Sequence, residues 1–353
     1  MAASALVACT SHELETFIAG LPKAELHLHI EGSFEPDLMF QVAQRNAIDI
    51  PFETIAELKA AYEFHNLQEF LDIYYEGMRA LRTEQDFYDL TWAYLLKAHS
   101  EKVLHTEIMF DPQAHTERGV AFSSVINGIH RAMSTARTDL GITSCLIMNF
   151  LRHLDEASAL HTLRESLPHR DKITAVGLDS TELNIPPTTF QRVFAEAREA
   201  GYRLVAHAGE EGPPEYVWQA LDQLQIERID HGNRCLEDEA LVRRLATDGV
   251  GLTVCPLSNL KLCVVSALDH HPLRLMLQKG LRPSINSDDP AYFGGYVNAN
   301  YAAVAQALGL TKAELALCAR ISFETSFLSE AEKEERVADV EEYLRRNGDA
   351  GAP

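Results

Sequence analysis

Residues 22–29 read Pro-Lys-Ala-Glu-Leu-His-Leu-His, a short β-like run that ends in two histidines two positions apart. Side chains two positions apart on a strand point to the same face, so the imidazoles of His27 and His29 can reach one ion. Seven further β-like runs follow, each separated from the next by polar residues and a helical pattern. The expected strands are Ala24–His29, Leu104–Phe110, Ile142–Met148, Ile173–Leu178, Arg203–Ala208, Arg228–His231, Val250–Val254 and Pro283–Ser287.

Strands that alternate with helices predict an α/β protein built from parallel βαβ units. Eight such units close naturally into a (β/α)8, or TIM, barrel. A doubly wound open sheet is the alternative. Because no repeat or low-complexity linker interrupts the chain, we expect residues 1–353 to form one domain.

The first two expected strands are separated by about 74 residues, far more than one crossover helix needs. We interpret residues 35–102 as an inserted helical cap over one mouth of the barrel. The charged, helical residues 311–346 are expected to pack outside it. The helices expected within the insertion are Glu35–Arg45, Thr54–Tyr62, Leu67–Ala80 and Glu84–Lys102.

The composition limits the classes of function. The chain is 46% hydrophobic and carries a net charge of -21, which argues against binding nucleic acid or an anionic membrane. No window of about 18 apolar residues predicts a membrane span. Residues 1–8 lack a basic region and are too short for a secretory signal, so a cytoplasmic location is expected. The six cysteines show no paired CxxC spacing, which argues against a cysteine-rich zinc site.

Polar residues occupy the carboxyl ends of several expected strands, where barrel enzymes place their active sites. His27 and His29 end the first strand, His207 ends the fifth, and Asp288 follows the eighth. Three imidazole nitrogens and one carboxylate oxygen suit zinc and leave a position for water, whose pKa zinc lowers to about 7. The other histidines, among them His115, His153 and His271, are interpreted as ordinary.

Two further strand-end residues can handle protons. His231 has no evident metal partner and can orient or deprotonate the water and stabilise the resulting charge. Glu210 lies in a Gly-containing turn and is the natural general acid, although Glu210-Glu211 is also typical of a solvated helix start. Asp288-Asp289-Pro290 is likewise a good helix start, yet one carboxylate can bind metal while Asp289 contacts the substrate.

These motifs, in their order and spacing, resemble the adenosine/adenine deaminase family of the amidohydrolase superfamily. The resemblance extends over nearly the whole chain. The matching segments are Pro22 to His29, His207-Ala208-Gly209-Glu210, Asp230-His231-Gly232 and Asn286-Ser287-Asp288-Asp289-Pro290.

The resemblance implies one zinc per subunit, held by His27, His29, His207 and Asp288. It implies that Glu210 protonates purine N1, so that C6 becomes electrophilic. His231 then assists addition of the activated water, while Asp289 hydrogen-bonds N7 and helps to pass a proton to the departing ammonia.

Two departures from the nucleoside deaminases resemble the adenine deaminase subgroup. Glu31 stands where an Asp near the ribose is usual, and its longer side chain would occupy ribose space. The segment Gly177-Leu178-Asp179-Ser180-Thr181-Glu182 replaces a Gly-Asp-Glu segment, with Thr181 where the subgroup has Ser. Gly177, Ser180 and Glu182 are expected to contact substrate. Glu182 would accept an N9–H or N7–H proton that only a free base has.

The resulting hypothesis is zinc-dependent deamination of adenine to hypoxanthine and ammonia, in purine salvage. The expected partner is a small purine, and a homo-oligomer remains open. Adenosine, an N6-substituted adenine or another adenine-bearing metabolite are alternative substrates. A metal amidase or phosphotriesterase is the alternative class, but the end of the fourth strand offers no Lys to bridge two metals. A non-enzymatic barrel would have to place all these side chains by accident.

Overall fold

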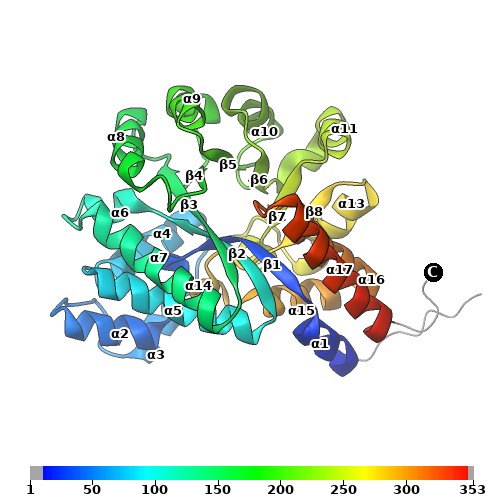
Figure 1. The fold of residues 1–353 in the computed structure, drawn as a ribbon, viewed down its shortest axis with the longest axis horizontal. Helices are drawn as coiled ribbons and strands as arrows, with labels where there is room; N and C mark the ends of the chain where they lie inside the picture. The colour runs from blue at the N-terminus through cyan, green and yellow to red at the C-terminus, as the bar shows by residue number, and fades with distance from the viewer. Residues whose placement is uncertain (1–10, 349–353) are drawn as a thin grey trace, which may run out of the picture.

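Eight parallel strands form the centre of the computed structural model, which describes residues 11–348 (Figure 1). Their order in the sheet follows their order in the chain. A doubly wound sheet would reverse its strand order partway, so this alternative is wrong and the (β/α)8 prediction is confirmed. The strands are β1 (Lys23–His29), β2 (Val103–Phe110), β3 (Thr143–Leu151), β4 (Ala175–Asp179), β5 (Arg203–Ala208), β6 (Arg228–His231), β7 (Gly251–Val254) and β8 (Arg282–Ile285).

The barrel is nearly closed by a short contact between the segment after β8 and β1. Leu28 and Asp288 form a parallel bridge. The His29 N–H donates to the Asp288 carbonyl at 3.0 Å, and the Asp288 N–H donates to the His27 carbonyl at 3.2 Å. This contact therefore places Asp288 directly beside the two histidines that end β1.

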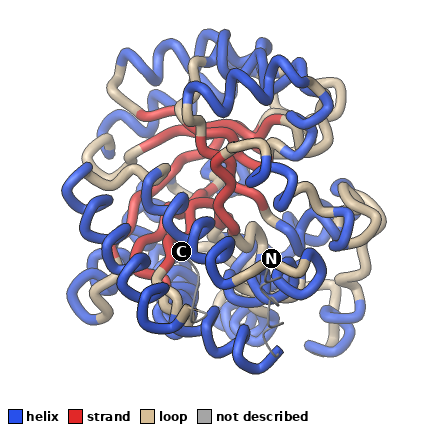
Figure 2. The backbone as a smooth tube through the Cα atoms, turned by 90° about the vertical axis from the view of Figure 1, so that its right-hand side faces the viewer, coloured by secondary structure: helices blue, strands red, loops and turns tan. Residues whose placement is uncertain are grey.

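Helices surround the strands on the outside, as the tube view shows (Figure 2). They are α1 (Ser11–Gly20), α2 (Pro36–Arg45), α3 (Ile55–Ala60), α4 (Leu67–Met78), α5 (Glu84–Ser100), α6 (Pro112–Thr116), α7 (Phe122–Asp139), α8 (Glu156–Ser166), α9 (Gln191–Glu199), α10 (Pro214–Gln219), α11 (Glu239–Asp248), α12 (Pro256–Lys261), α13 (Leu273–Gln278), α14 (Pro290–Phe293), α15 (Val297–Leu308), α16 (Lys312–Glu324) and α17 (Glu330–Asn347).

Four of these helices, α2 to α5, lie between β1 and β2, and capping side chains explain where three of them begin. Thr54 accepts the Glu57 N–H at the start of α3, and Asn66 accepts the Glu69 N–H at the start of α4. Thr83 opens α5 with a capping box. Side chains of α4 reach the central pocket described below. That residues 35–102 act as a cap over the mouth stays a prediction.

A buried ion pair lies within the barrel near the amino ends of its strands. Arg228 is the first residue of β6, and its Nη1 donates to Glu107 Oε2 of β2 at 2.6 Å. The Phe327 ring lies 4.6 Å from this guanidinium group. Side chains therefore fill this end of the barrel, and the polar strand ends at the opposite mouth remain the place for chemistry.

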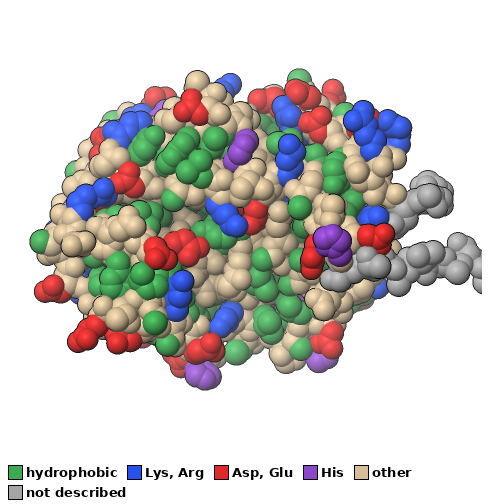
Figure 3. Space-filling model, turned by 90° about the horizontal axis from the view of Figure 1, so that it is seen from below, with side chains coloured by type: hydrophobic (Ala, Val, Ile, Leu, Met, Phe, Trp, Pro, Cys, Tyr) green, Lys and Arg blue, Asp and Glu red, His purple; other side chains and the backbone are tan. Residues whose placement is uncertain are grey.

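Acidic, basic and hydrophobic side chains are interspersed on the face of residues 11–348 that Figure 3 shows. No helix in this part of the chain combines the length and the apolar character that crossing a membrane requires. The signal-peptide argument concerned residues 1–8, which lie outside the described residues, as does Cys9.

Candidate active site

Side chains from three strand ends converge at the carboxyl mouth of the barrel. His27 and His29 come from β1, His207 from β5, and Asp288 from the segment that follows β8. Their candidate ligand atoms all lie within 4.8 Å of one another, and all four residues are buried. Asp288 Oδ1 is 3.2 Å from His27 Nε2 and 3.5 Å from His29 Nε2, and His29 Nε2 is 3.4 Å from His207 Nε2.

The chemistry of this donor set fits a bound cation. His27 Nε2 is buried without a hydrogen-bond partner, although it points toward the other three candidate ligands. The Thr253 hydroxyl donates to Asp230 at 2.8 Å, so it accepts the proton of His27 Nδ1 at 2.9 Å. The lone pair of His27 therefore lies on Nε2, as an outer hydrogen bond of this kind arranges for metal-binding histidines.

The backbone at this mouth is strained at two positions that the sequence singled out. Asp288 and His231 both have a φ of 63°, in the left-handed region that residues other than Gly rarely occupy. Such a conformation costs on the order of 1–3 kcal/mol and persists where the surrounding structure holds it. Here it turns both side chains toward the same point.

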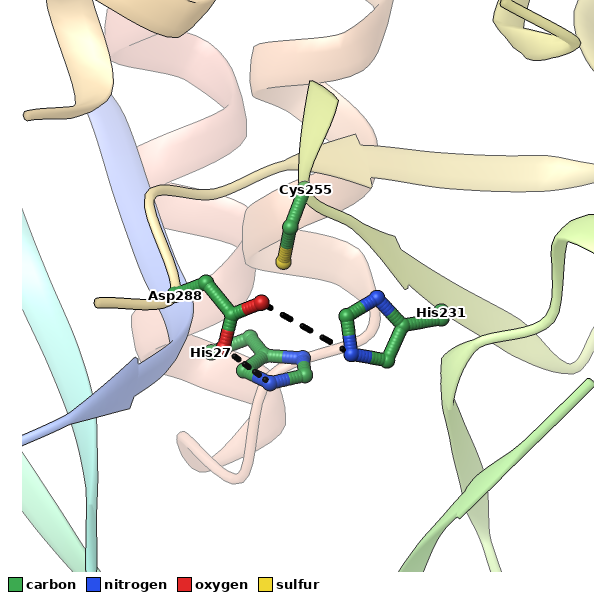
Figure 4. Close-up of side chains that lie close together, drawn as sticks. All are labelled: His27, His231, Cys255 and Asp288. Atoms are coloured by element: carbon green, nitrogen blue, oxygen red, sulfur yellow. Dashed lines mark ion pairs between the residues drawn. The ribbon is translucent and has the colours of Figure 1, made fainter. Parts of the chain in front are cut away.

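Cys255 belongs to a second group that could hold a metal, together with His27, His231 and Asp288 (Figure 4). Burial, and then the charge of Asp288, raise the pKa of the Cys255 thiol well above its usual range. A protonated thiol is a poor ligand, because metals bind the thiolate. The set with His29 and His207 is therefore the better candidate.

A pocket of about 420 Å³, its mouth included, opens beside the candidate metal ligands. Three apolar and two tyrosine side chains of α4 contribute to its wall, which suits a flat aromatic ligand. Of the residues that the sequence proposed, the lining contains three of the four metal-binding candidates, His29, His207 and Asp288, but not His27. It also contains Glu210, His231, Asp289 and Ser180. The lining also includes Leu67, Phe70, Leu71, Tyr74, Tyr75, Asp111, Leu151, Asp179 and Leu262.

Glu210 has the position and the raised pKa that a proton donor needs. Its Oε2 lies 3.5 Å from His231 Nε2, and its Oε1 is buried without a partner. Burial, and then the neighbouring charge of Asp288, raise the pKa of Glu210 well above its usual range. The raised pKa favours the protonated carboxyl group, which can donate its proton into the pocket.

The sequence predicts that Glu182 contacts the substrate, but in the structure Glu182 is not among the residues that line the pocket. Its Oε1 accepts the Gly209 N–H at 3.0 Å, and its Oε2 accepts the N–H groups of Glu210, Glu211 and Gly212. Arg152 Nη1 lies 3.6 Å from the same carboxylate. Both oxygens are thus occupied, so Glu182 holds the loop that carries Glu210, and its contact with the substrate stays a prediction.

Glu182→Gln is expected to lower kcat about 10- to 100-fold with little change in KM. The amide has one acceptor oxygen, so at least one backbone N–H of the loop faces an NH2 group, and small misplacements of a catalytic group are costly. Steady-state kinetics on adenine measure the effect. Glu211→Gln, a half-buried neighbour, is the matched control. A variant with unchanged kcat on adenine but increased turnover of adenosine would restore the substrate contact that the sequence predicted.

Glu31 and Gly177 are also not on the pocket surface. Glu31 is fully buried, and its Oε1 accepts the Asp111 N–H at 3.1 Å and lies 2.8 Å from His115 Nε2. Gly177 lies within β4, where an added Cβ would be 2.0 Å from Asn149 Oδ1. Glu31 Oε1 therefore supports the neighbouring strand end, while its buried Oε2 has no partner, and Gly177 makes room for Asn149. Substrate contact by Glu31 and by Gly177 stays a prediction.

Asp111 and Asp179 line the pocket, although the sequence assigned them no role. Asp111 follows β2 and Asp179 ends β4, so the strand-end rule that selected the histidines would also have found them. Burial, and then the charge of Glu31, raise the pKa of Asp111 to about 8. Ser180, the next residue, has a φ of 73°, and its hydroxyl lies 2.8 Å from His153 Nδ1.

Comparison with known proteins identifies relatives along almost the whole chain. The adenosine deaminase family model matches residues 22–343. The chain is 61% identical to an adenine deaminase of Sphingopyxis alaskensis over 94% of this chain and 98% of that one. The crystal structure of an adenine deaminase from Arthrobacter aurescens has a TM-score of 0.91 and 50% identity, covering 92% and 99% of the two chains. An amidohydrolase of Burkholderia ambifaria, solved with bound Zn, has a TM-score of 0.87 and 25% identity, covering 98% and 97%.

Proposed function

Because the chain belongs to the adenosine deaminase family, we propose that it is an enzyme that hydrolyses adenine to hypoxanthine and ammonia. The observation that carries the proposal is the 61% identity to an adenine deaminase across nearly the full length of both chains. The pocket supports it, because three of the four candidate metal ligands line it together with Glu210, a carboxyl group whose pKa is raised.

We propose that one zinc ion per chain is held by His27, His29, His207 and Asp288. The convergence of their ligand atoms and the Zn bound in the Burkholderia ambifaria relative support this assignment. When bound, zinc lowers the pKa of a water molecule to about 7 and so supplies a nucleophile at neutral pH.

The residues of the chain itself would handle the protons. Glu210 donates to purine N1, which makes C6 electrophilic. His231 orients or deprotonates the attacking water and stabilises the developing charge. Asp289 lines the pocket and has a buried oxygen, Oδ1, without a partner, so it is free to bind N7 and to help protonate the leaving ammonia.

A free base, as opposed to a nucleoside, is proposed on the strength of the relatives. Both carboxylate oxygens of Glu182 are engaged by protein groups, whereas Glu31 has its Oε1 engaged and its buried Oε2 without a partner. The groups that line the pocket, including Asp111, Asp179 and Tyr75, are further candidates for this selectivity.

A substrate panel tests the proposed activity. We expect rapid loss of adenine absorbance, with turnover of adenosine and of isopentenyladenine at least about 100-fold slower at equal concentration. Product analysis checks that hypoxanthine and ammonia form in equal amounts. Faster turnover of adenosine than of adenine would contradict the proposed substrate while leaving the deaminase chemistry intact.

The wider setting of the enzyme stays a prediction. Purine salvage and a cytoplasmic location are expected from the sequence alone, and the oligomeric state is open. Light scattering at working concentration measures the oligomeric state. Metal analysis that finds two zinc ions per chain would revive the amidase or phosphotriesterase alternative.

A further inference from the structure

Asn259 lies behind His231, in the segment Cys255-Pro256-Leu257-Ser258-Asn259, which follows β7 and which the proposed chemistry does not use. It is fully buried in α12, and its Nδ2 is 3.5 Å from His231 Nδ1. On the other side of the amide, Asn259 Oδ1 is 2.7 Å from Asn233 Nδ2 and 3.1 Å from His271 Nε2. This buried chain of polar groups therefore ends on a ring that faces the pocket.

The direction of these hydrogen bonds is set by a backbone group. The Leu273 N–H, which can only donate, lies 3.2 Å from His271 Nδ1. Burial lowers the pKa of His271 to about 4, so its ring is neutral at physiological pH. Because Nδ1 accepts, the single ring proton is on Nε2, and this nitrogen donates to Asn259 Oδ1.

The same logic extends to His231. With its oxygen accepting from both His271 and Asn233, the Asn259 amide must present its NH2 group to His231 Nδ1. An NH2 group has hydrogens but no lone pair to offer, so His231 Nδ1 accepts. The neutral ring then has its proton on Nε2, which lies 3.5 Å from Glu210 Oε2 and 3.8 Å from Asp288 Oδ2.

We propose that Asn259, oriented by His271 and Asn233, is a positioning residue that fixes His231 in the tautomer with its proton on Nε2. His231 then enters the reaction as a hydrogen-bond donor toward the oxygen that adds to the substrate. It does not act as the base, because a water whose pKa is lowered to about 7 can release its proton to solvent before the addition. This inference rests on the proposed deaminase function and selects between the two roles that the sequence left open for His231.

The tautomer can be measured directly on the zinc-loaded protein, without substrate. Long-range nitrogen–proton correlations of [15N]histidine-labelled enzyme distinguish the two neutral tautomers, and the His231 signal is assigned by its loss in His231→Gln. We expect the proton on Nε2. A proton on Nδ1 in the wild-type protein would overturn the proposal, whereas failure of the substrate panel would overturn the proposed function and leave this result standing.

Asn259→Asp tests the consequence for catalysis. The carboxylate still accepts from His271 and Asn233, but it presents an acceptor to His231 and so favours a proton on Nδ1. We expect the tautomer to invert, kcat to fall on the order of 10²- to 10⁴-fold, KM to change less than about threefold, and zinc content to stay at the wild-type value. An inverted tautomer with wild-type kcat would overturn the proposed role.

Two controls separate positioning from general damage. Asn300→Asp makes the same change at another fully buried amide, which accepts the Leu257 N–H of the same helix, and is expected to lower stability but leave kcat per folded molecule unchanged. His271→Gln keeps a donor for Asn259 and should retain kcat within about threefold, whereas His271→Leu should lose about tenfold. If the two His271 variants had equal activities, the proposal that His271 orients Asn259 would be wrong.

Discussion

A Glu210→Gln enzyme is expected to lose about 10²- to 10⁴-fold in kcat on adenine, the range that a positioned general acid contributes. The amide matches the shape of the carboxyl group but has no acidic proton to give to purine N1. The Glu210 carboxyl is buried against His231, and its pKa is raised by burial and then by Asp288. A cation bound to Asp288 would reduce the effect of the Asp288 charge on the pKa of Glu210, but it would leave the effect of burial, which is the larger of the two.

The same substitution should not destabilise the protein at neutral pH. The folded-state pKa of Glu210 is raised, so the unfolded chain releases this proton more readily, and folding loses stability as pH rises above about 4.5. A neutral Gln removes that penalty. Kinetics, metal analysis and thermal melting of Glu210→Gln are compared with Glu215→Gln, a control on α10. Wild-type kcat in Glu210→Gln would remove it as the acid.

The strand-end residues explain why so much of the site could be predicted from the sequence. Carboxyl ends of parallel strands meet at one mouth, so His27, His29 and His207 needed only correct strand assignment to be brought together. The strand boundaries vary by a few residues, as for β3, which continues to Leu151. Such shifts do not move a residue to the other mouth of the barrel.

Residues in the loops after the strands could not be oriented in the same way. Glu182 follows β4, but its direction depends on backbone N–H groups at Gly209 to Gly212 and on Arg152, which only the folded chain brings near. Glu31 likewise turns toward His115, which is distant in sequence and which the sequence argument treated as ordinary. Family patterns indicate that such carboxylates matter, but not whether they contact the substrate or the protein.

An Asp288→Asn enzyme is expected to lose most of its bound metal, and its activity with it. Asp288 supplies the one negative charge among the four candidate ligands, and its Oδ1 lies 3.2 Å from His27 Nε2 and 3.5 Å from His29 Nε2. Altering outer partners of a metal site commonly costs 10- to 100-fold in affinity, so removing the charge of a direct ligand should cost at least that. Metal per chain after dialysis, and the rise in melting temperature on adding zinc, measure the loss.

Asp230→Asn gives a graded comparison, because Asp230 holds Thr253, which in turn orients His27. We expect Asp230→Asn to weaken metal binding about 10- to 100-fold and Asp288→Asn to weaken it further. Cys255→Ser, at the edge of the competing ligand group, should leave metal content unchanged because the buried thiol keeps its proton. Metal lost by Cys255→Ser as well as by Asp288→Asn would transfer the site to that group, because Asp288 belongs to both groups and Cys255 only to the second. It would require His231 to act as a ligand, which would also exclude its role as a donor.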